Sequence, residues 1–434
     1  MKLRRRYLFA GLLLLPLGLA LVSWAGVLFM AQGGMTPLRV PNTGTRQLSS
    51  DPQVLERGHY LARIGNCAGC HTRQGGPPYA GGRGFGTAYG RIYSSNLTPD
   101  PSHGIGSWTR EEFHHAMRHG VSRSGVQSPV FPYANFAHLA AADLDALFDY
   151  LGSVPAVAEA APADVLEFPA DLPGAMLFWR MLNYRPVALA EAAERSVDWR
   201  RGRDLVNGIG HCAICHGSRG SLAALSDAAQ LGSSTISGWY APPLDQLSLQ
   251  RYAQGQLAHY LRGGLVDGRG GYGGMADVIA HSLQHLQATD ADAVETYLRS
   301  LPPAPRAATR PATLKASDQH IALGTRLYTE HCADCHGREG EGEAGKYPAL
   351  KDSPALTGPD PINAIKLVLF GAVPPSTPLN PRPYSMPPHA QQLSADEVAA
   401  LINAMRQRWG QRDLAPVTAD EVRSKGGIAP RWGA

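Results

Sequence analysis

The chain repeats one short motif, Cys-x-x-Cys-His, three times, and these motifs contain all six of its cysteines. Two thiols three positions apart lie on one side of a helical turn, where they can add to the two vinyl groups of one porphyrin. The adjacent imidazole then lies under the ring and can supply a nitrogen to iron. The sequence therefore predicts three covalently bound haem c groups. The thiol pairs are Cys67 and Cys70, Cys212 and Cys215, and Cys332 and Cys335, and the iron-ligating histidines are His71, His216 and His336.

Two other chemistries also use closely spaced cysteine pairs. A structural zinc site would need a second Cys or His pair near each motif. A redox-active dithiol does not require a His after every pair. Three motifs that leave no cysteine over favour haem attachment against both alternatives.

The N-terminus places the basic residues Lys2, Arg4, Arg5 and Arg6 before an uncharged run of 25 residues, 7–31. A membrane-spanning helix needs about 20 apolar residues, whereas the apolar core of a secretory signal has about 7–15. Residues 1–34 are therefore predicted to be a transmembrane anchor. A signal peptide is the alternative, because Ser23-Trp24-Ala25 resembles a small-x-small cleavage site. In both cases the basic cluster stays in the cytoplasm and the rest is exported.

The composition limits the possible partners. The chain has 434 residues, enough for two or three domains, and its net charge is only +4. Beyond the N-terminus it contains no basic block, which argues against nucleic acid. Its 48 Gly and 34 Pro suit small haem domains whose loops wrap closely around a porphyrin.

Each haem motif lies within a similar stretch of chain, and we call these stretches the first, second and third repeats. A helix containing Gly58, Gly202 or Gly324 precedes each motif, and an amphipathic helix closes each repeat, within 139–155, 286–302 and 393–406. The glycine lets the two helices cross closely. The predicted fold is all-α, with three tandem cytochrome c domains, and each repeat is expected to have its own core.

The predicted boundaries follow from these repeats and from composition. The cytochrome c domains are 50–156, 199–303 and 318–412, the linkers are 157–198 and 304–317, and 413–434 is a C-terminal tail. The first linker is too apolar for a free tether and is expected to pack between repeats or against a partner subunit. The second linker has the composition of an extended tether.

A methionine sulfur opposite the histidine is typical of an electron-carrying haem. Met386 lies in a proline-stiffened loop and Met275 in a glycine-rich loop, each between a haem motif and the last helix. Both are predicted iron ligands. Met405 lies inside the last helix, where it is expected to be a core residue.

The first repeat departs from this pattern. Phe131 stands where the sulfur is expected, and Met117 lies earlier, inside a predicted helix. The first iron therefore has His71 as a predicted ligand and an open question on its other side. Nitrogen ligands could come from His114, His115, His119 or His138.

The chain resembles the three-haem cytochrome c subunits of membrane-bound periplasmic dehydrogenases, over about residues 55–422. The resemblance is carried by segments 86–100, 104–108, 116–121, 239–242, 274–278 with 281–282, and 408–410. It implies an electron-transfer subunit of a dehydrogenase complex rather than its catalytic subunit. Electrons would pass from a molybdenum, quinoprotein or flavin catalytic subunit, with or without a small iron–sulfur or accessory subunit, to ubiquinone. The location implied is the periplasmic side of the cell inner membrane.

One departure from the family bears on the partner. The family usually has Tyr-Pro-Ala-Met-Pro-Tyr where this chain has Phe131, and the variant resembles cytochromes paired with molybdenum hydroxylases. This favours an aldehyde dehydrogenase partner over an alcohol dehydrogenase. The alternative function is an exported haem enzyme of peroxidase type that uses the first haem, although no Arg–His pair is evident beside Phe131. A soluble shuttle cytochrome is disfavoured by the N-terminal run and by the size.

Overall fold

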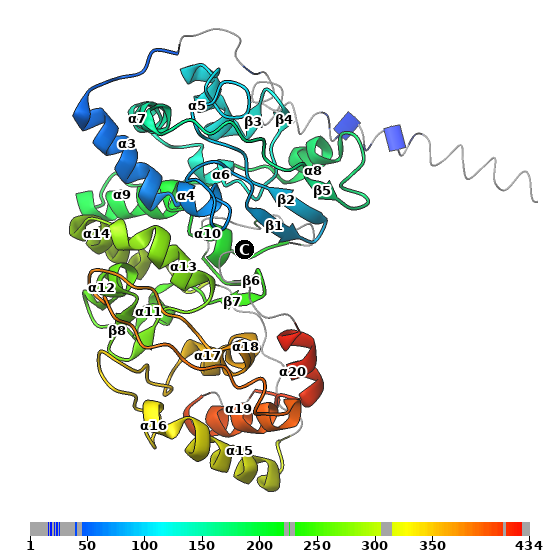
Figure 1. Cartoon of the computed structure of the whole chain (residues 1–434), viewed down its shortest axis with the longest axis vertical. Helices are drawn as coiled ribbons and strands as arrows, with labels where there is room; N and C mark the ends of the chain where they lie inside the picture. Colours follow the sequence, from blue (N-terminus) through cyan, green and yellow to red (C-terminus); the bar gives the residue numbers. More distant parts are fainter. Residues whose placement is uncertain are drawn as a thin grey trace, which may run out of the picture.

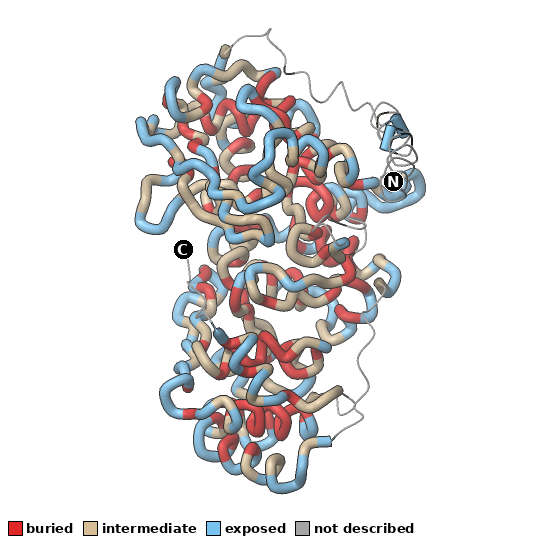
Figure 2. The backbone as a smooth tube through the Cα atoms, turned by 90° about the vertical axis from the view of Figure 1, so that its right-hand side faces the viewer, coloured by how far each residue is buried: buried red, intermediate tan, exposed pale blue. Residues whose placement is uncertain are grey.

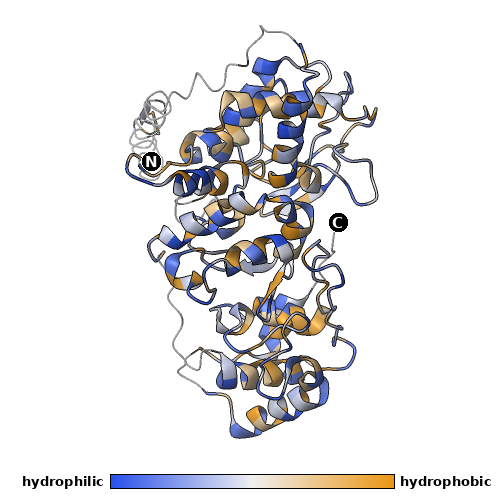
Figure 3. Cartoon of the chain, turned by 90° about the vertical axis from the view of Figure 1, so that its left-hand side faces the viewer, coloured by the Kyte–Doolittle hydropathy of each residue, from blue (hydrophilic) through white to orange (hydrophobic). Residues whose placement is uncertain are grey.

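The computed structural model describes residues 46–220, 225, 231–304, 315–410 and 414–427, together with a few isolated positions before residue 46. The described part is mostly helical, as predicted, and also contains four small antiparallel sheets. The three repeats stack in sequence order, with the first at the top and the third at the bottom of Figure 1. Most helices carry hydrophobic residues on one side and hydrophilic residues on the other (Figure 3), so each buries one face.

The first repeat surrounds its haem motif with helices and two small sheets. Helix α5 begins at a capping box formed by Thr109 and Glu112, and it ends at Gly120 in the left-handed conformation. The elements are α3 Pro52–Ile64, α4 Cys67–Cys70, β1 Gly84–Thr87, β2 Gly90–Tyr93, α5 Arg110–His119, β3 Val121–Ser122, β4 Gly125–Val126, α6 Tyr133–Phe136 and α7 Ala141–Ser153.

The second repeat follows the same order of elements around the second motif. Its first helix continues into a single π-helical turn, η1, directly before the cysteine pair. The elements are α9 Val197–Asp204, η1 Leu205–Ile209, α10 Ala213–His216, β6 Ser234–Ile236, β7 Trp239–Ala241, α11 Gln246–Leu249, α12 Gln256–Gly263, β8 Leu265–Val266, β9 Arg269–Gly270, α13 Gly274–His281, the 3₁₀ turn η2 Leu283–His285 and α14 Ala288–Ser300.

The described residues of the third repeat form helices joined by loops, with isolated β-bridges but no strand. A capping box of Ser394 and Glu397 starts its last long helix. The elements are α15 Asp318–His331, α16 Ala333–His336, α17 Pro354–Thr357, α18 Ile362–Phe370, α19 Ala395–Trp409 and α20 Ala419–Gly426. Helix α20, within the predicted tail, packs on α18 and α19.

The first and last long helices of each repeat cross at a glycine, as the sequence predicts. A Cβ added to Gly58 on α3 would overlap the carbonyl oxygen of Ala146 on α7. Gly202 meets α14 and Gly324 meets α19 in the same way, at the carbonyl oxygens of Ala293 and Ala400. Only a residue without a side chain allows the two backbones to approach this closely.

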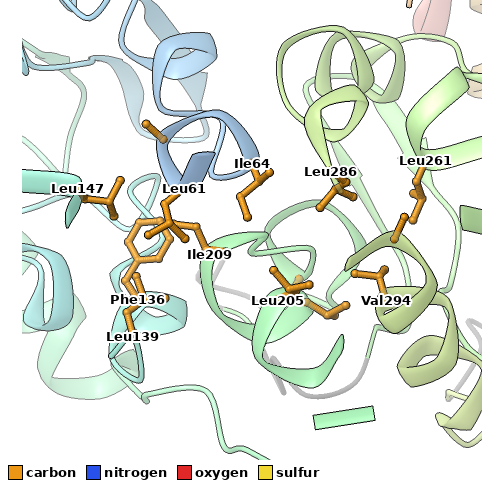
Figure 4. Close-up of a cluster of buried hydrophobic side chains, with 14 of the residues drawn as sticks. Leu61, Ile64, Phe136, Leu139, Leu147, Leu205, Ile209, Leu261, Leu286 and Val294 are labelled. Carbon is orange, nitrogen blue, oxygen red and sulfur yellow. The ribbon is translucent and has the colours of Figure 1, made fainter. Parts of the chain in front are cut away.

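The first two repeats share one hydrophobic core, so the expectation that each repeat has its own core is wrong for them. Figure 4 shows Ile64 and Phe136 of the first repeat in the same cluster as Leu205, Ile209 and Val294 of the second. The buried cluster continues from one repeat to the other. The first and second repeats therefore form one packing unit.

Polar contacts reinforce this junction. Asp290 on α14 accepts two hydrogen bonds from Arg201, at 2.7 and 2.8 Å, and one from the hydroxyl of Tyr60 on α3, at 2.5 Å. The hydroxyl of Ser282 donates to the Ile64 carbonyl at 2.8 Å. The third repeat, in contrast, packs its buried residues into a separate core, and buried segments are visible at both ends of the column in Figure 2.

The first predicted linker is part of the first repeat's structure. Strand β5 (Val165–Leu166) pairs antiparallel with β2 and completes a three-stranded sheet. Helix α8 (Ala175–Asn183) follows, and the Val187 amide then donates to the Ala134 carbonyl at 3.1 Å. We expected this segment to pack either between repeats or against a partner subunit. In the structure it packs against the first repeat of the same chain. Most of the second predicted linker lies outside the described residues.

No helix among the described residues is both long enough and apolar enough to cross a membrane. The predicted anchor, residues 1–34, lies mostly outside the residues that the structure describes.

Candidate cofactor sites

Each Cys-x-x-Cys-His motif forms a single helical turn: α4 in the first repeat, α10 in the second and α16 in the third. In each motif the amide of the histidine donates to the carbonyl of the first cysteine, at 2.8 to 2.9 Å. This bond closes the turn and brings both thiols and the imidazole to adjacent positions. None of the six cysteines forms a disulfide.

All three motif histidines are held by the same kind of hydrogen bond. The Nδ1 atom of His71 donates to the Ser95 carbonyl at 2.7 Å. In the second and third repeats His216 donates to Pro242 at 2.6 Å and His336 to Pro348 at 2.8 Å. An imidazole that donates from Nδ1 presents the lone pair of Nε2, which is the tautomer that a metal ligand requires.

Burial keeps these imidazoles neutral. It lowers the pKa of His71, His216 and His336, and the hydrogen bond to the backbone carbonyl offsets part of this effect. A neutral ring is required for Nε2 to bind iron. The three histidines thus have the orientation and the protonation state of proximal haem ligands.

A cavity of about 1150 Å³ joins the motifs of the second and third repeats. Sites for a single small ligand usually measure about 300–1,000 Å³, so this cavity is larger than one such site. Its walls include both cysteines and the histidine of each of these motifs, and it extends to Cys70 of the first motif. The space and the donor groups fit haem c at the second and third motifs.

The two predicted methionine ligands line this same cavity. Met275 lies in the first turn of α13 and packs against the shared core. Met386 forms an antiparallel bridge with Ala372, with hydrogen bonds of 2.9 and 3.1 Å that fix its loop. The described structure therefore brings each methionine to the cavity that also receives the motif histidine of its repeat. Met405 also lines the cavity, but it is buried in the core of the third repeat.

Phe131 occupies the same place in the first repeat as Met275 in the second. Helices α5 and α12 both end at a left-handed glycine, Gly120 or Gly264, and a short hairpin follows each. Phe131 lies eleven residues after Gly120, and Met275 lies eleven residues after Gly264. The Phe131 ring contacts the ring of Phe136, with 5.5 Å between centroids.

Two of the four candidate histidines in the first repeat use Nε2 for other contacts. His114 pairs with Asp145 at 2.8 Å, and His138 pairs with the Val187 carbonyl at 2.7 Å. His115 uses Nδ1 for the Val121 carbonyl, and its Nε2 is buried without a partner among the described residues. Burial lowers the pKa of His119 to about 4, and the neighbouring His115 adds to the effect.

An Arg–His pair that the sequence did not reveal lies near the loop that contains Phe131. Arg180 on α8 interacts electrostatically with His119 and is 2% exposed. Its guanidinium lies 3.9 Å from the centroid of the Tyr184 ring and 5.3 Å from that of Tyr133. The two tyrosine rings hold the guanidinium in place by cation–π contact. Met117, the other candidate, lies in the shared hydrophobic core.

The alternatives to haem fit the motifs poorly. Among the described residues, which include all six cysteines, no group of three or more His, Cys, Asp and Glu is placed to hold a metal ion. Burial raises the pKa of the Cys67 and Cys212 thiols to about 12 and that of Cys215 and Cys332 to about 11. Redox-active dithiols need a lowered thiol pKa.

The carbonyls that hold the motif histidines were missed in the sequence. A weak signal was present, because a tyrosine precedes each of them by one or two positions: Tyr93 before Ser95, Tyr240 before Pro242 and Tyr347 before Pro348. The carbonyls lie 24, 26 and 12 residues after their histidines. This irregular spacing hides them from a search for repeats.

Comparison with known proteins gives the same class. Residues 321–409, in the third repeat, match the Cytochrome c family model. The chain is 33% identical to the cytochrome c subunit of the quinone alcohol dehydrogenase of Gluconacetobacter polyoxogenes, over 86% of this chain and 84% of the relative. It is 35% identical to the gluconate 2-dehydrogenase cytochrome c subunit of Pantoea cypripedii, over 86% and 89%. It is 34% identical to one of the subunits of the nicotinate dehydrogenase of Pseudomonas putida, over 86% of this chain and 32% of the relative.

The fold and the motifs define a c-type cytochrome, and its three thiol pairs can hold up to three haems c. More narrowly, the chain belongs to the family of cytochrome c subunits of membrane-bound dehydrogenases. The resemblance inferred from the sequence is thereby confirmed.

Proposed function

We propose that this chain is the three-haem electron-transfer subunit of a periplasmic membrane-bound dehydrogenase and that it passes electrons from the catalytic subunit to ubiquinone. Each repeat is a cytochrome c domain. The observation that carries the proposal is the threefold recurrence of one site: a thiol pair on a helical turn and a histidine whose Nδ1 donates to a backbone carbonyl at 2.6 to 2.8 Å. Bound haem c supplies one-electron redox chemistry.

The chain's own residues hold and orient the cofactor. Each cysteine pair would form two thioether bonds, and His71, His216 and His336 would bind iron through Nε2. Met275 and Met386 would supply sulfur on the opposite face in the second and third domains, which raises the potential and excludes small ligands. Support for these two ligands comes from their position on the cavity that the motifs line.

The three sites follow one another as the steps of a relay do. The second and third motifs line one cavity, which also reaches Cys70 of the first motif. Burial is the main cause of the raised pKa of Cys215, and the nearby Cys70 thiol adds to it, so the first and second motifs are neighbours. The second site thus adjoins both of the others and would be the middle of the relay.

The first site differs from the other two. Phe131 cannot bind iron, so this iron would be five-coordinate or would take a nitrogen from a nearby histidine. Of the candidates, His115 has a buried Nε2 with no hydrogen-bond partner among the described residues. The potential of this haem would be lower than that of a methionine-ligated haem.

The catalytic partner and the membrane attachment extend the same proposal. Three relatives are named as subunits of alcohol, gluconate and nicotinate dehydrogenases, and we propose a catalytic subunit of molybdenum, quinoprotein or flavin type for this chain. Phe131 favours a molybdenum aldehyde dehydrogenase, with a small iron–sulfur or accessory subunit that connects the two. The N-terminal run, residues 7–31, would anchor the chain in the inner membrane with its haem domains in the periplasm.

The proposal is tested by purifying the protein from membranes, together with whatever large subunit accompanies it. The denatured protein should retain three haems per chain, and the reduced protein should be reoxidised by a water-soluble ubiquinone analogue. Fewer than three covalent haems, or no reoxidation by the quinone, would refute the proposal. Changing Cys212 and Cys215 to Ala should remove one haem and weaken the first repeat as well as the second, because the two share a core.

A further inference from the structure

A lysine is buried where the third repeat meets the second. Lys366 on α18 is 7% exposed and lines the cavity that joins the second and third motifs. Its ammonium lies 5.4 Å from the centroid of the Trp239 ring on β7. The lysine belongs to the third repeat, but its charged end thus lies against the second.

The turn between β6 and β7 leaves room for this ammonium. Gly238 has a φ of +73°, and a Cβ added there would overlap Lys366 Nζ. One helical turn before the lysine, Asn363 is buried and makes a pair of hydrogen bonds with the backbone of Tyr240. It accepts from the Tyr240 amide at 2.9 Å and donates to its carbonyl at 2.8 Å. These bonds fix α18 against β7, so the position of the ammonium is set by the fold.

Apart from the contact with the Trp239 ring, the ammonium has no hydrogen-bond or ion-pair partner among the described residues. Burial lowers the pKa of Lys366, and no described carboxylate lies close enough to raise it. Leaving a charge buried without a counter-ion is strongly unfavourable. A lysine held in this way therefore indicates an anionic group that enters the cavity from outside the polypeptide. Each haem carries two propionate carboxylates, and the cavity has the donor groups for two haems.

We propose that Lys366 is the counter-ion of a propionate of the haem attached to Cys212 and Cys215. The inference rests on the proposed function, because it requires haem in this cavity. The assignment to the second haem follows from the path of the chain. Strand β7, which contacts the lysine, leads directly to Pro242, whose carbonyl accepts the hydrogen bond from His216 at 2.6 Å. The third repeat thus supplies a charge to the site of the second.

A fixed positive charge near a haem favours the reduced form, which carries one more electron. Lys366 therefore raises the potential of the second haem. Because the lysine lies on α18 of the third repeat, this effect also depends on the contact between the two repeats. Asn363 acts as a positioning residue in this arrangement, through its bonds to Tyr240.

The test is a spectroelectrochemical titration of the full-length holoprotein with Lys366→Met, whose unbranched side chain is one atom shorter and carries no charge. One of the three haem reduction potentials should fall by about 59 mV. For a one-electron couple this corresponds to a tenfold smaller equilibrium constant for reduction. Lys366→Arg should keep the original potential. Lys351→Met is the matched control, because Lys351 lines the same cavity but is exposed, and it should change none of the potentials.

A second titration identifies the haem concerned. In the Met275→Leu protein, the shift caused by Lys366→Met should fall on the haem whose spectrum Met275→Leu has altered. A shift on the haem altered by Met386→Leu would overturn the assignment to the second site. Three unchanged potentials in a protein with three haems would overturn the role of Lys366 altogether, whereas fewer than three haems in the unmodified protein would count against the proposed function.

Variants that fail to assemble also decide the question. If Lys366→Met and Lys366→Gln both lose the second haem while Lys366→Arg keeps it, the charge is required at this site and the proposal is supported. If Lys366→Arg fails as well, the lysine serves only to fill space and the proposal is wrong.

Discussion

Removing one isoleucine should distinguish the shared core from the separate one. Ile209 ends η1 in the second repeat, is 3% exposed and packs against Gly65 of the first repeat. Ile365 on α18 is 0% exposed and belongs to the core of the third repeat. Ile209→Ala and Ile365→Ala delete the same atoms from equally buried sites. Each should cost about 2–5 kcal/mol of the free energy of unfolding, from lost burial and from the cavity left behind.

The two variants should differ in which part of the protein melts earlier. Calorimetry should resolve one transition for the first two repeats and another for the third. A loss of about 3 kcal/mol corresponds to about 6–12 °C in a unit of 150–250 residues and to about 12–24 °C in one of 60–100 residues. Ile209→Ala should lower only the first of these transitions, and Ile365→Ala only the second. If Ile209→Ala splits the first transition into two, the first and second repeats do not unfold as one unit and our description of the core is wrong.

The remaining predictions concern the iron ligands and the junction. Met275→Leu and Met386→Leu should each lower the potential of one haem by on the order of 100 mV, within the roughly 0.8 V that axial ligands can span, and carbon monoxide should then bind to that haem. Phe131→Met should raise the potential of the first haem, and near-infrared spectra showing three His/Met irons in the unmodified protein would contradict this account of Phe131. Asp290 should contribute a pH-dependent stability. Burial opposes its ionisation, but the hydrogen bonds from Arg201 and Tyr60 outweigh burial and lower its pKa in the folded protein. The contribution is therefore present above the unfolded pKa, near 3.8, and is lost as the pH falls below it. Denaturant unfolding at pH 3 and pH 6 should show a smaller difference for Asp290→Asn than for the unmodified protein.

The haem motifs could be found in the sequence because their geometry is local. A Cys-x-x-Cys-His segment brings its thiols and imidazole together through one helical turn, whatever the rest of the chain does. The glycines at the helix crossings were also predictable, since Gly58, Gly202 and Gly324 each stand at the same place before a motif. Met275 and Met386 could be proposed from loop composition and order along the chain, and the structure brings both to the cavity.

Other features depend on contacts between distant parts of the chain, which the sequence pattern does not reveal. The carbonyl of Ser95 holds His71 because a loop returns to the motif. The core shared by the first two repeats could not be predicted from the sequence. Ile209 and its neighbours would show the same hydrophobic pattern whether they packed within one repeat or across two. No motif or spacing in the sequence sets Lys366 apart from other lysines. The sequence by itself was enough to predict up to three haem sites and the thiols and histidines that would form them, because short-range spacing is enough for that. The tertiary structure decided which repeats pack as one unit and which charge from one repeat reaches the site of another, because both follow from long-range packing.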